Sequence, residues 1–221
     1  MKRTRVWDLP VRLFHWALVV LVVTSFVTQQ IGGNAMQWHF RAGYATLTLI
    51  LFRIAWGLVG PRYARFSAFL RGPSAIMAYL RGRSKIVSPG HNPLGSLSVL
   101  AMLLVLLFQA LAGLFANDDI ASEGPLVKFI SKEWSDQATW LHTEIGATLI
   151  VLLVGLHLAA IAWYLLRKKQ NLVVPMITGD KNLDDSAPGA DDGWRVRLLA
   201  AVLLVACAGA VYLVVNLPPS T

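Results

Sequence analysis

The sequence predicts an all-α integral membrane protein, on the grounds of its composition and of the lengths of its apolar runs. Of its 221 residues, 56% are hydrophobic and 14% are charged, whereas a soluble domain usually has about 25% charged residues. Several apolar runs reach about 20 residues, the length that crosses a bilayer as a helix. Because lipid offers the backbone no other hydrogen-bond partner, each run is expected to be helical. Five such runs are predicted, over about 13–30, 38–60, 94–116, 140–166 and 197–217.

Proline and glycine mark the ends of the first three runs. The first begins after Pro10, and its length argues against a signal peptide, whose apolar core has about 7–15 residues. The second ends at Gly60-Pro61, which is a helix stop signal, and the third begins after Pro93. Between them, residues 62–93 mix large apolar residues with arginines, a pattern typical of an amphipathic segment on a membrane surface.

The C-terminal part separates into a polar stretch and a last apolar run. Residues 171–193 are polar and contain five aspartates, which predicts a flexible linker. The sequence therefore predicts three segments: a membrane domain over 1–170, a polar cytoplasmic linker over 171–194 and a C-terminal transmembrane helix over 195–221. The last run contains no histidine, and its sequence leaves open whether it packs on the other helices or recruits a partner.

The net charge of +8 is distributed in a way that predicts topology and does not suggest nucleic-acid binding. The N-terminus, the loop 62–93 and the end of the fourth run are basic, whereas the loop 117–136 is acidic. Because lysine and arginine accumulate on the cytoplasmic side of membrane proteins, the N-terminus is expected in the cytoplasm and the C-terminus outside it.

Four histidines lie near the ends of the predicted helices: His15, His39, His142 and His157. Histidine in hydrocarbon is costly and marks a functional site by default. His142 and His157 are 15 residues apart on one helix, and are therefore about 22 Å and about 60° apart. By depth, His15 is level with His157 at the inner face, and His39 is level with His142 at the outer face. These pairs predict two bis-histidine haems stacked across the membrane, with irons about 20 Å apart.

Two other uses of the histidines are open. Histidines at membrane interfaces also cap helices or meet lipid headgroups, and a transition-metal transporter would use them as ligands. A transporter would need carboxylates or thiols at one depth, but Glu144 is the only acidic residue well inside a run and Cys207 is the only cysteine. The chain has no C-x-x-C-H motif for covalent attachment, so any haem would be held by coordination alone.

Two arginines and the fifth histidine complete the candidate site residues. Arg53 lies 14 residues after His39, level with the inner pair, where an unpaired arginine is expensive, so we expect it to bind a haem propionate. Arg41 is the candidate for the outer haem, although it lies close enough to the interface to reach water. His91 precedes the third run; it is either an interfacial helix-start residue or a hydrogen-bonding, proton-exchanging group of a quinone site.

Six stretches of the sequence together form a specific pattern. They are Trp7-Asp8-Leu9-Pro10-Val11-Arg12-Leu13-Phe14-His15-Trp16, His39-Phe40-Arg41-Ala42-Gly43-Tyr44, Arg53-Ile54-Ala55-Trp56-Gly57-Leu58-Val59-Gly60, Tyr63-Ala64-Arg65-Phe66, His91-Asn92-Pro93-Leu94-Gly95, and His142 and His157 followed by Asn171-Leu172-Val173. These stretches resemble the bacterial cytochrome b561 family, which includes the di-haem cytochrome b subunits of membrane-bound nickel–iron hydrogenases. The resemblance covers about residues 5–181 and implies a four-helix transmembrane bundle that binds two haems b through the same histidine pairs, with the fifth helix outside the shared core.

The resemblance also implies a location and a function. It implies a multi-pass protein of the bacterial inner membrane that moves electrons between quinone and a periplasmic redox partner, such as a c-type cytochrome or a hydrogenase. Two alternatives are open. The first is a superoxide:quinone oxidoreductase that acts without a partner and attracts superoxide through outward-facing basic residues, for which Lys128 and Lys132 are the candidates. The second is a haem-free membrane anchor.

Overall fold

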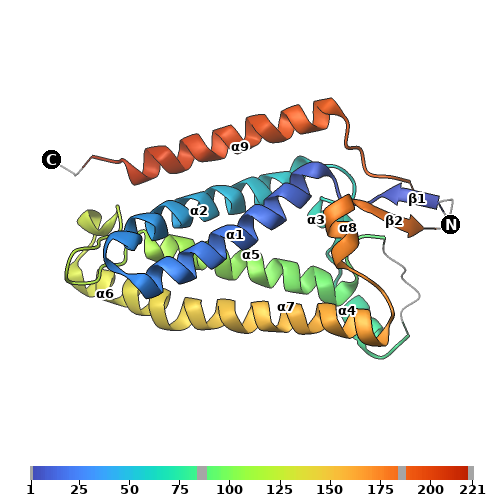
Figure 1. The fold of residues 1–221 in the computed structure, drawn as a ribbon, viewed down its shortest axis with the longest axis horizontal. Coiled ribbons are helices and arrows are strands. Elements are labelled where there is room, and N and C mark those ends of the chain that lie inside the picture. Colours follow the sequence, from blue (N-terminus) through green and yellow to red (C-terminus); the bar gives the residue numbers. More distant parts are fainter. Residues whose placement is uncertain (1, 84–88, 184–187, 219–221) are drawn as a thin grey trace. The chain divides into compact units, whose positions relative to one another are not determined.

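The computed structural model describes residues 2–83, 89–183 and 188–218, and it contains five helices long and apolar enough to cross a membrane. They include α1 (Leu9–Ile31), α2 (Met36–Val59), α5 (Pro93–Gly113) and α9 (Trp194–Val215) (Figure 1). The remaining one runs continuously from Lys132 to Arg167. The prediction of a helical protein with five helices of membrane-crossing length and composition is therefore confirmed.

The long helix Lys132–Arg167 is built from three parts. It comprises α6 (Lys132–Trp140), a wide π-helical turn (Leu141–Gly146) and α7 (Ala147–Arg167). The sequence predicted a start near Trp140, but the helix begins at Lys132. The segment α6 is polar, and its few apolar residues do not recur with a helical period. Its helical signal is instead Glu133 in the first turn, where a negative charge stabilises the helix dipole.

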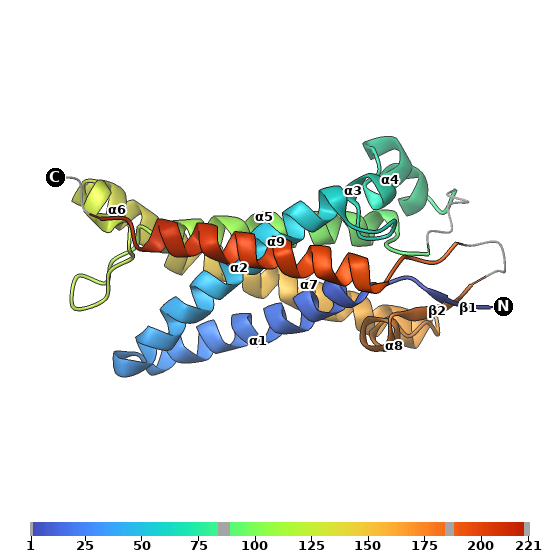
Figure 2. The ribbon, with the colours of Figure 1, turned by 90° about the horizontal axis from the view of Figure 1, so that it is seen from above.

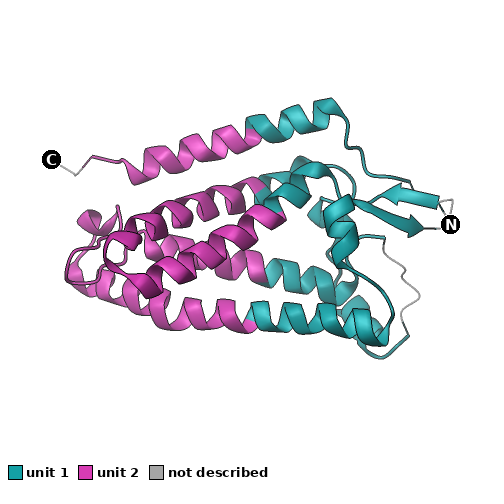
Figure 3. Ribbon diagram, viewed as in Figure 1, with its two compact units in different colours: residues 1–14, 53–101, 153–202 teal, residues 15–52, 102–152, 203–221 magenta. Residues whose placement is uncertain are grey.

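The chain divides into two compact units, and each long helix contributes a part to both (Figure 3). Unit 1 consists of residues 1–14, 53–101 and 153–202, and unit 2 consists of residues 15–52, 102–152 and 203–221. Of the predicted histidine ligands, His15, His39 and His142 belong to unit 2, and His157 belongs to unit 1.

Unit 1 contains a small sheet that the sequence did not predict. The strand β1 (Lys2–Arg5) pairs antiparallel with β2 (Asp180–Leu183), next to the short helix α8 (Val173–Thr178) (Figure 2). Arg3 and Arg5 both form ion pairs with Asp180, at 2.9 Å. The stretch predicted as a flexible linker is thus partly ordered as α8 and β2, while residues 184–187 of that prediction lie outside the described residues.

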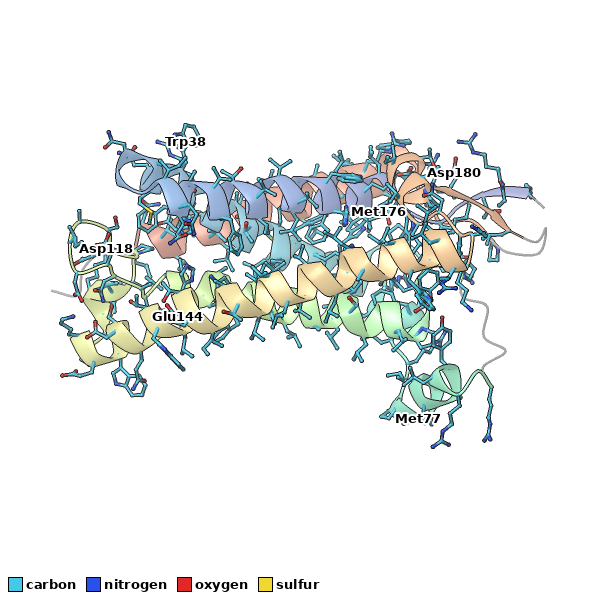
Figure 4. All side chains as sticks on the ribbon, turned by 60° about the horizontal axis from the view of Figure 1, so that its bottom comes forward. Trp38, Met77, Asp118, Glu144, Met176 and Asp180 are labelled. Carbon is cyan, nitrogen blue, oxygen red and sulfur yellow. The ribbon has the colours of Figure 1, made fainter. Side chains whose placement is uncertain are left out.

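Two short helices of unit 1 occupy the predicted amphipathic segment. They are α3 (Phe66–Phe69) and α4 (Pro73–Leu80). The phenol of Tyr79 on α4 is hydrogen-bonded to that of Tyr164 on α7, with 2.7 Å between the oxygens. Met77, labelled in Figure 4, and Leu80 remain about half exposed. The segment therefore has an attached face and an exposed apolar face, which suits a membrane surface.

The C-terminal helix packs into unit 2. Val211 on α9 is buried in one cluster with Leu47 of α2 and Leu114 of α5. Its neighbours Tyr212 and Leu213 are about two-thirds exposed, as expected for a face that meets lipid. The sequence left open whether the last helix packs on the other helices or recruits a partner. At this end, the buried face of α9 packs on residues of the same chain.

Candidate cofactor site

Two of the predicted ligands lie close together in unit 2. His39 stands in the first turn of α2, and His142 stands in the π-helical turn between α6 and α7. Their ring centroids are 6.0 Å apart and their planes are nearly perpendicular, at 85°. Turns of the π-helical type occur often at functional sites. The sequence-predicted outer pair is therefore brought together within one compact unit.

Each of these rings is oriented by a backbone carbonyl. The Nδ1 atom of His39 lies 2.9 Å from the carbonyl oxygen of Ser25 on α1, and that of His142 lies 2.9 Å from the carbonyl oxygen of Gln109 on α5. A carbonyl only accepts, so the tautomer that satisfies each contact carries its proton on Nδ1. The Nε2 lone pair then remains for a metal, and metal-binding histidines are commonly oriented by this kind of contact.

The side chain of Gln109 makes a second connection to the π-helical turn. Its Nε2 atom donates a hydrogen bond to the carbonyl oxygen of His142, at 3.0 Å. A Cβ atom at Gly146 would collide with the Gln109 carboxamide, so glycine is what lets this side chain reach the turn. Gln109 thus supports His142 through both its backbone and its side chain. The sequence showed Gln109 only as a polar residue in an apolar run, and Ser25 carried no signal.

A cavity of about 270 Å³ in unit 2 has both histidines in its wall. It is lined by α1, α2, α5 and the helix Lys132–Arg167. A Cβ atom at Gly43 would meet nothing within 4 Å, whereas one at Gly113 would lie 2.8 Å from Cε1 of His142. Glu144, on the π-helical turn (Figure 4), is also among the lining residues, which include both polar and apolar side chains.

The geometry of this site fits a haem. A metal–nitrogen bond is about 2 Å long, and the centroid of an imidazole lies about 1 Å further on, so two rings on opposite sides of one iron have centroids about 6 Å apart. The observed separation is 6.0 Å. Gln109 Oε1 and Thr46 Oγ1 are buried beside the cavity without a hydrogen-bond partner among the residues that the structure describes. Within the described ranges, no group of three or more histidine, cysteine or acidic side chains could hold a metal ion.

The predicted inner pair is divided between the units. His15 lies in α1 within unit 2, where its ring meets that of Trp16 edge-on. His157 lies in α7 within unit 1. Their pairing across one iron stays a prediction based on their depth in the helices.

Arg53 is buried in unit 1, as its position in α2 predicted. Its side chain is 3% exposed, and its guanidinium carbon lies 5.1 Å from the ring centroid of Phe66 and 6.0 Å from that of Phe69. Within the described residues, Nη1 has no hydrogen-bond partner. The carboxyl group of Asp8, for which the sequence carried no signal, also acts on the charge of Arg53. A buried guanidinium with a free donor suits a propionate of a haem.

Arg41 and His91 lie in different surroundings from those of Arg53. Arg41 is exposed, and its guanidinium lies over the ring of Trp38, 5.0 Å from the centroid. It is not among the residues that line the described cavity. His91 is half-buried in unit 1, where its ring contacts those of Trp7 and Phe69 at centroid distances of 4.7 and 5.1 Å.

The acidic loop of unit 2 is tightly organised. Oδ1 of Asp118 accepts hydrogen bonds from three successive backbone amides, those of Ile120, Ala121 and Ser122. These bonds hold the pKa of the Asp118 carboxyl well below its usual range. Both basic side chains of this region are engaged: Lys132 bonds to Asp119 and Asp136, and Lys128 donates to the carbonyl oxygen of Leu217.

Comparisons with known proteins agree with these features. A family model described as prokaryotic cytochrome b561 matches residues 6–179. A probable Ni/Fe-hydrogenase B-type cytochrome subunit of Rhizobium leguminosarum bv. viciae is 24% identical over 216 residues, covering 81% of this chain and 89% of the relative. The subunit of the same description from Cupriavidus necator is 27% identical over 223 residues, covering 84% and 89%. No solved structure matches the chain significantly.

Proposed function

Because the chain belongs to the prokaryotic cytochrome b561 family, we propose that it carries electrons across the bacterial inner membrane between quinone and a periplasmic redox protein. Family membership and five apolar helices make it a multi-pass membrane protein and a haem b cytochrome of electron transport. We propose, in addition, the path of the electrons, the number of haems and the redox partners.

The observation that carries the proposal is the pair His39 and His142. Their 6.0 Å separation and their carbonyl-bound Nδ1 atoms suit two neutral imidazoles on opposite sides of one iron. His15 and His157 are proposed to hold a second haem at the inner face. Haem iron with two imidazole ligands has no open position, so it exchanges electrons without binding a substrate. The role of the chain is to fix the orientation, depth and potential of the cofactors.

The arginines and His91 receive unequal roles. Arg53 is proposed to bind a propionate of the inner haem, because its buried Nη1 lacks a partner among the described residues. Arg41 is proposed for the outer haem, but it reaches a propionate only by leaving Trp38. His91 is proposed to contact quinone near the N-terminus of α5, where its two aromatic neighbours would flank a quinone ring.

The proposed orientation has the N-terminus in the cytoplasm and both the C-terminus and the acidic loop in the periplasm. The basic residues of β1, of the segment after α2 and of the end of α7 support it, because such residues stay on the cytoplasmic side. A hydrogenase is a candidate partner, since the relatives are described as probable B-type cytochrome subunits of Ni/Fe-hydrogenases. A c-type cytochrome is the other candidate class.

The rival functions receive less support. A superoxide reaction would need basic side chains free to attract an anion, but Lys132 is held by Asp119 and Asp136, and Lys128 by the carbonyl of Leu217. A haem-free anchor is at odds with membership of a cytochrome family. It would also leave the cavity beside His39 and His142 without a purpose.

The experiment is a haem count with a redox spectrum. Purified chain is analysed by pyridine haemochrome assay and by reduced-minus-oxidised spectroscopy, with His142→Ala and His157→Ala as matched variants. We expect two low-spin b haems per chain, and one in each variant. A second measurement reconstitutes the chain in vesicles and follows haem reduction by added quinol. Two haems in His142→Ala, or none in the wild-type chain, would overturn the proposal, and rapid superoxide decay without a partner would favour the first rival.

A further inference from the structure

Unit 1 contains a cavity of about 690 Å³ that the proposed electron transfer does not use. Its walls are formed by Arg3 of β1, the connection from α7 to α8, the helix α8, the strand β2 and Pro89 (Figure 2). Binding sites for small molecules have volumes of about 300–1,000 Å³. Every lining residue belongs to unit 1, so the cavity is formed within one compact unit and has the size of a ligand site.

The wall of this cavity carries a positive charge without a carboxylate partner. Lys181 on β2 is partly buried, and its Nζ donates to the carbonyl oxygen of Pro89 at 2.9 Å. No carboxylate of the described residues pairs with this ammonium group. Asp180, which also lines the cavity (Figure 4), is held instead by Arg3 and Arg5, at 2.9 Å each. Burial lowers the pKa of Lys181, so an anion in the cavity would stabilise its charged form.

The cavity is also lined by three side-chain amides that can donate hydrogen bonds. They belong to Gln170, Asn171 and Asn182, and their nitrogen atoms form no hydrogen bond with a described residue. The oxygen of Asn171 is engaged, since it accepts the backbone N–H groups of Val173 and Val174 at 2.9 and 3.0 Å. Its amide nitrogen is therefore the group left for a ligand. Amide donors beside an ammonium group suit the oxygens of a phosphate, because hydrogen bonds to ionised oxygens are strong.

An apolar surface adjoins this polar cavity. Val174 of α8 and Leu183 of β2 are among the lining residues. On α8, Val173, Val174 and Ile177 are 38%, 49% and 57% exposed. The preceding helix α7 belongs to a segment apolar enough to cross a membrane, and Leu166 near its end is 65% exposed. A short helix with an exposed apolar face beside a membrane span suits the membrane surface, where lipid headgroups are the nearest source of phosphate.

We propose that this cavity binds the headgroup of one anionic phospholipid, such as phosphatidylglycerol, whose acyl chains lie along the exposed apolar faces of α8 and α7. The phosphodiester of this lipid carries one negative charge, which matches the one ammonium group in the wall, that of Lys181, without a carboxylate. The three amides would bind the remaining oxygens of the headgroup. This lipid site goes beyond electron transfer and does not rest on it, because it requires only that the chain lies in a membrane.

The test is native mass spectrometry of the full-length purified protein, with dioleoyl phosphatidylglycerol or dioleoyl phosphatidylcholine added in detergent. We expect phosphatidylglycerol to bind more tightly. Lys181→Gln should weaken its binding by about ten- to a hundredfold, the loss expected for a charged hydrogen bond, and leave phosphatidylcholine binding unchanged. Lys168→Gln is the matched control, because it removes the same charge from an exposed site outside the cavity lining. Its smaller effect should disappear at high salt, which screens exposed charges.

A second variant decides the matter even if Lys181→Gln does not fold. Asn182→Trp should fill the cavity and prevent phosphatidylglycerol binding, and it removes no hydrogen bond of the side chain to a described residue. Equal affinities for the two lipids, an unchanged affinity in Lys181→Gln or Asn182→Trp, or an equal loss in Lys168→Gln would overturn the proposal. Glycerophosphoglycerol is the same headgroup without acyl chains. If it bound as tightly as the lipid, the assignment to a lipid would be overturned in favour of a soluble phosphate ester.

Discussion

The backbone of Gly113 on α5 lies against the imidazole ring of His142. A Cβ atom at this position would be 2.8 Å from Cε1 and 3.0 Å from Nδ1 of that ring. The same ring is bound through Nδ1 to the carbonyl of Gln109, one turn earlier on α5. The helix α5 therefore fixes the position and the tilt of the His142 ring. The carbonyl group of Gln109 binds the ring, and the absence of a Cβ atom at Gly113 leaves room for it.

Gly113→Ala is expected to weaken the outer haem site. Alanine favours a helix over glycine by about 0.5–1 kcal/mol, so local propensity alone predicts a stabilised α5. The displaced His142 ring should instead lower the haem content toward one per chain, measured by pyridine haemochrome. Gly209→Ala on α9 is the matched control, because its Cβ would meet nothing within 4 Å. Equal haem contents in the two variants would contradict this role of Gly113.

Gly43→Ala tests whether the cavity holds the cofactor. Its Cβ would meet no atom of the chain within 4 Å, yet Gly43 lines the cavity beside His39. The haem-free chain should therefore tolerate the change, and the thermal stability of the apoprotein should not fall. Haem loading, followed by titration of haem into apoprotein, should weaken. Unchanged loading would mean that the ring of the cofactor does not approach this part of α2.

Arg53→Gln should lower the midpoint potential of the proposed inner haem. A buried positive charge stabilises the reduced form, and at about 10 Å and an effective dielectric constant near 20 it is worth on the order of 1–2 kcal/mol, or several tens of millivolts. Arg41→Gln is the matched variant at an exposed site stacked on Trp38, where solvent screens the charge, so its effect on the potential of the proposed outer haem should be the smaller of the two. Redox titration of both variants makes the comparison. A larger shift for Arg41→Gln would reverse the roles proposed for the two arginines.

Val211→Ala should destabilise unit 2. Val211 is 4% exposed and packs with Leu47 and Leu114, so removing its methyl groups leaves a small void that costs on the order of 1 kcal/mol. For a chain of this size, the cost corresponds to a fall in Tm of about 2–4 °C. Val205→Ala, at a position on α9 that is 71% exposed, should leave the Tm in detergent unchanged. Equal Tm values for the two variants would mean that α9 is not held by this cluster.

The features that could be predicted from the sequence depend on local helical geometry. The five helices follow from apolar length, and the meeting of His39 with His142 follows from their depth, since helical rise is constant. The features that were missed depend on contacts between distant segments. The bond from Trp56 to Asp8 joins residues 48 apart, and the β1–β2 ladder joins the N-terminus to residues 180–183. No periodic pattern encodes such partners. The π-helical turn was missed because its sequence resembles that of an ordinary helix.

The loop that begins at Asp118 should remain ordered in acid and loosen only at pH values well below the usual titration of aspartate. Its carboxylate accepts the amides of Ile120, Ala121 and Ser122 at 2.8–2.9 Å, and these bonds lower its pKa from the ordinary value of about 3.9. A group with a lowered folded-state pKa stabilises the fold above its unfolded pKa, and the contribution disappears as the pH falls through the folded pKa. The amide resonances of the three residues should therefore titrate together, with a midpoint below about 3.9 in NMR spectra. In Asp118→Ala, these amides should exchange faster at neutral pH, because they have lost their acceptor. A midpoint at or above 3.9 would mean that the hydrogen bonds do not persist in solution.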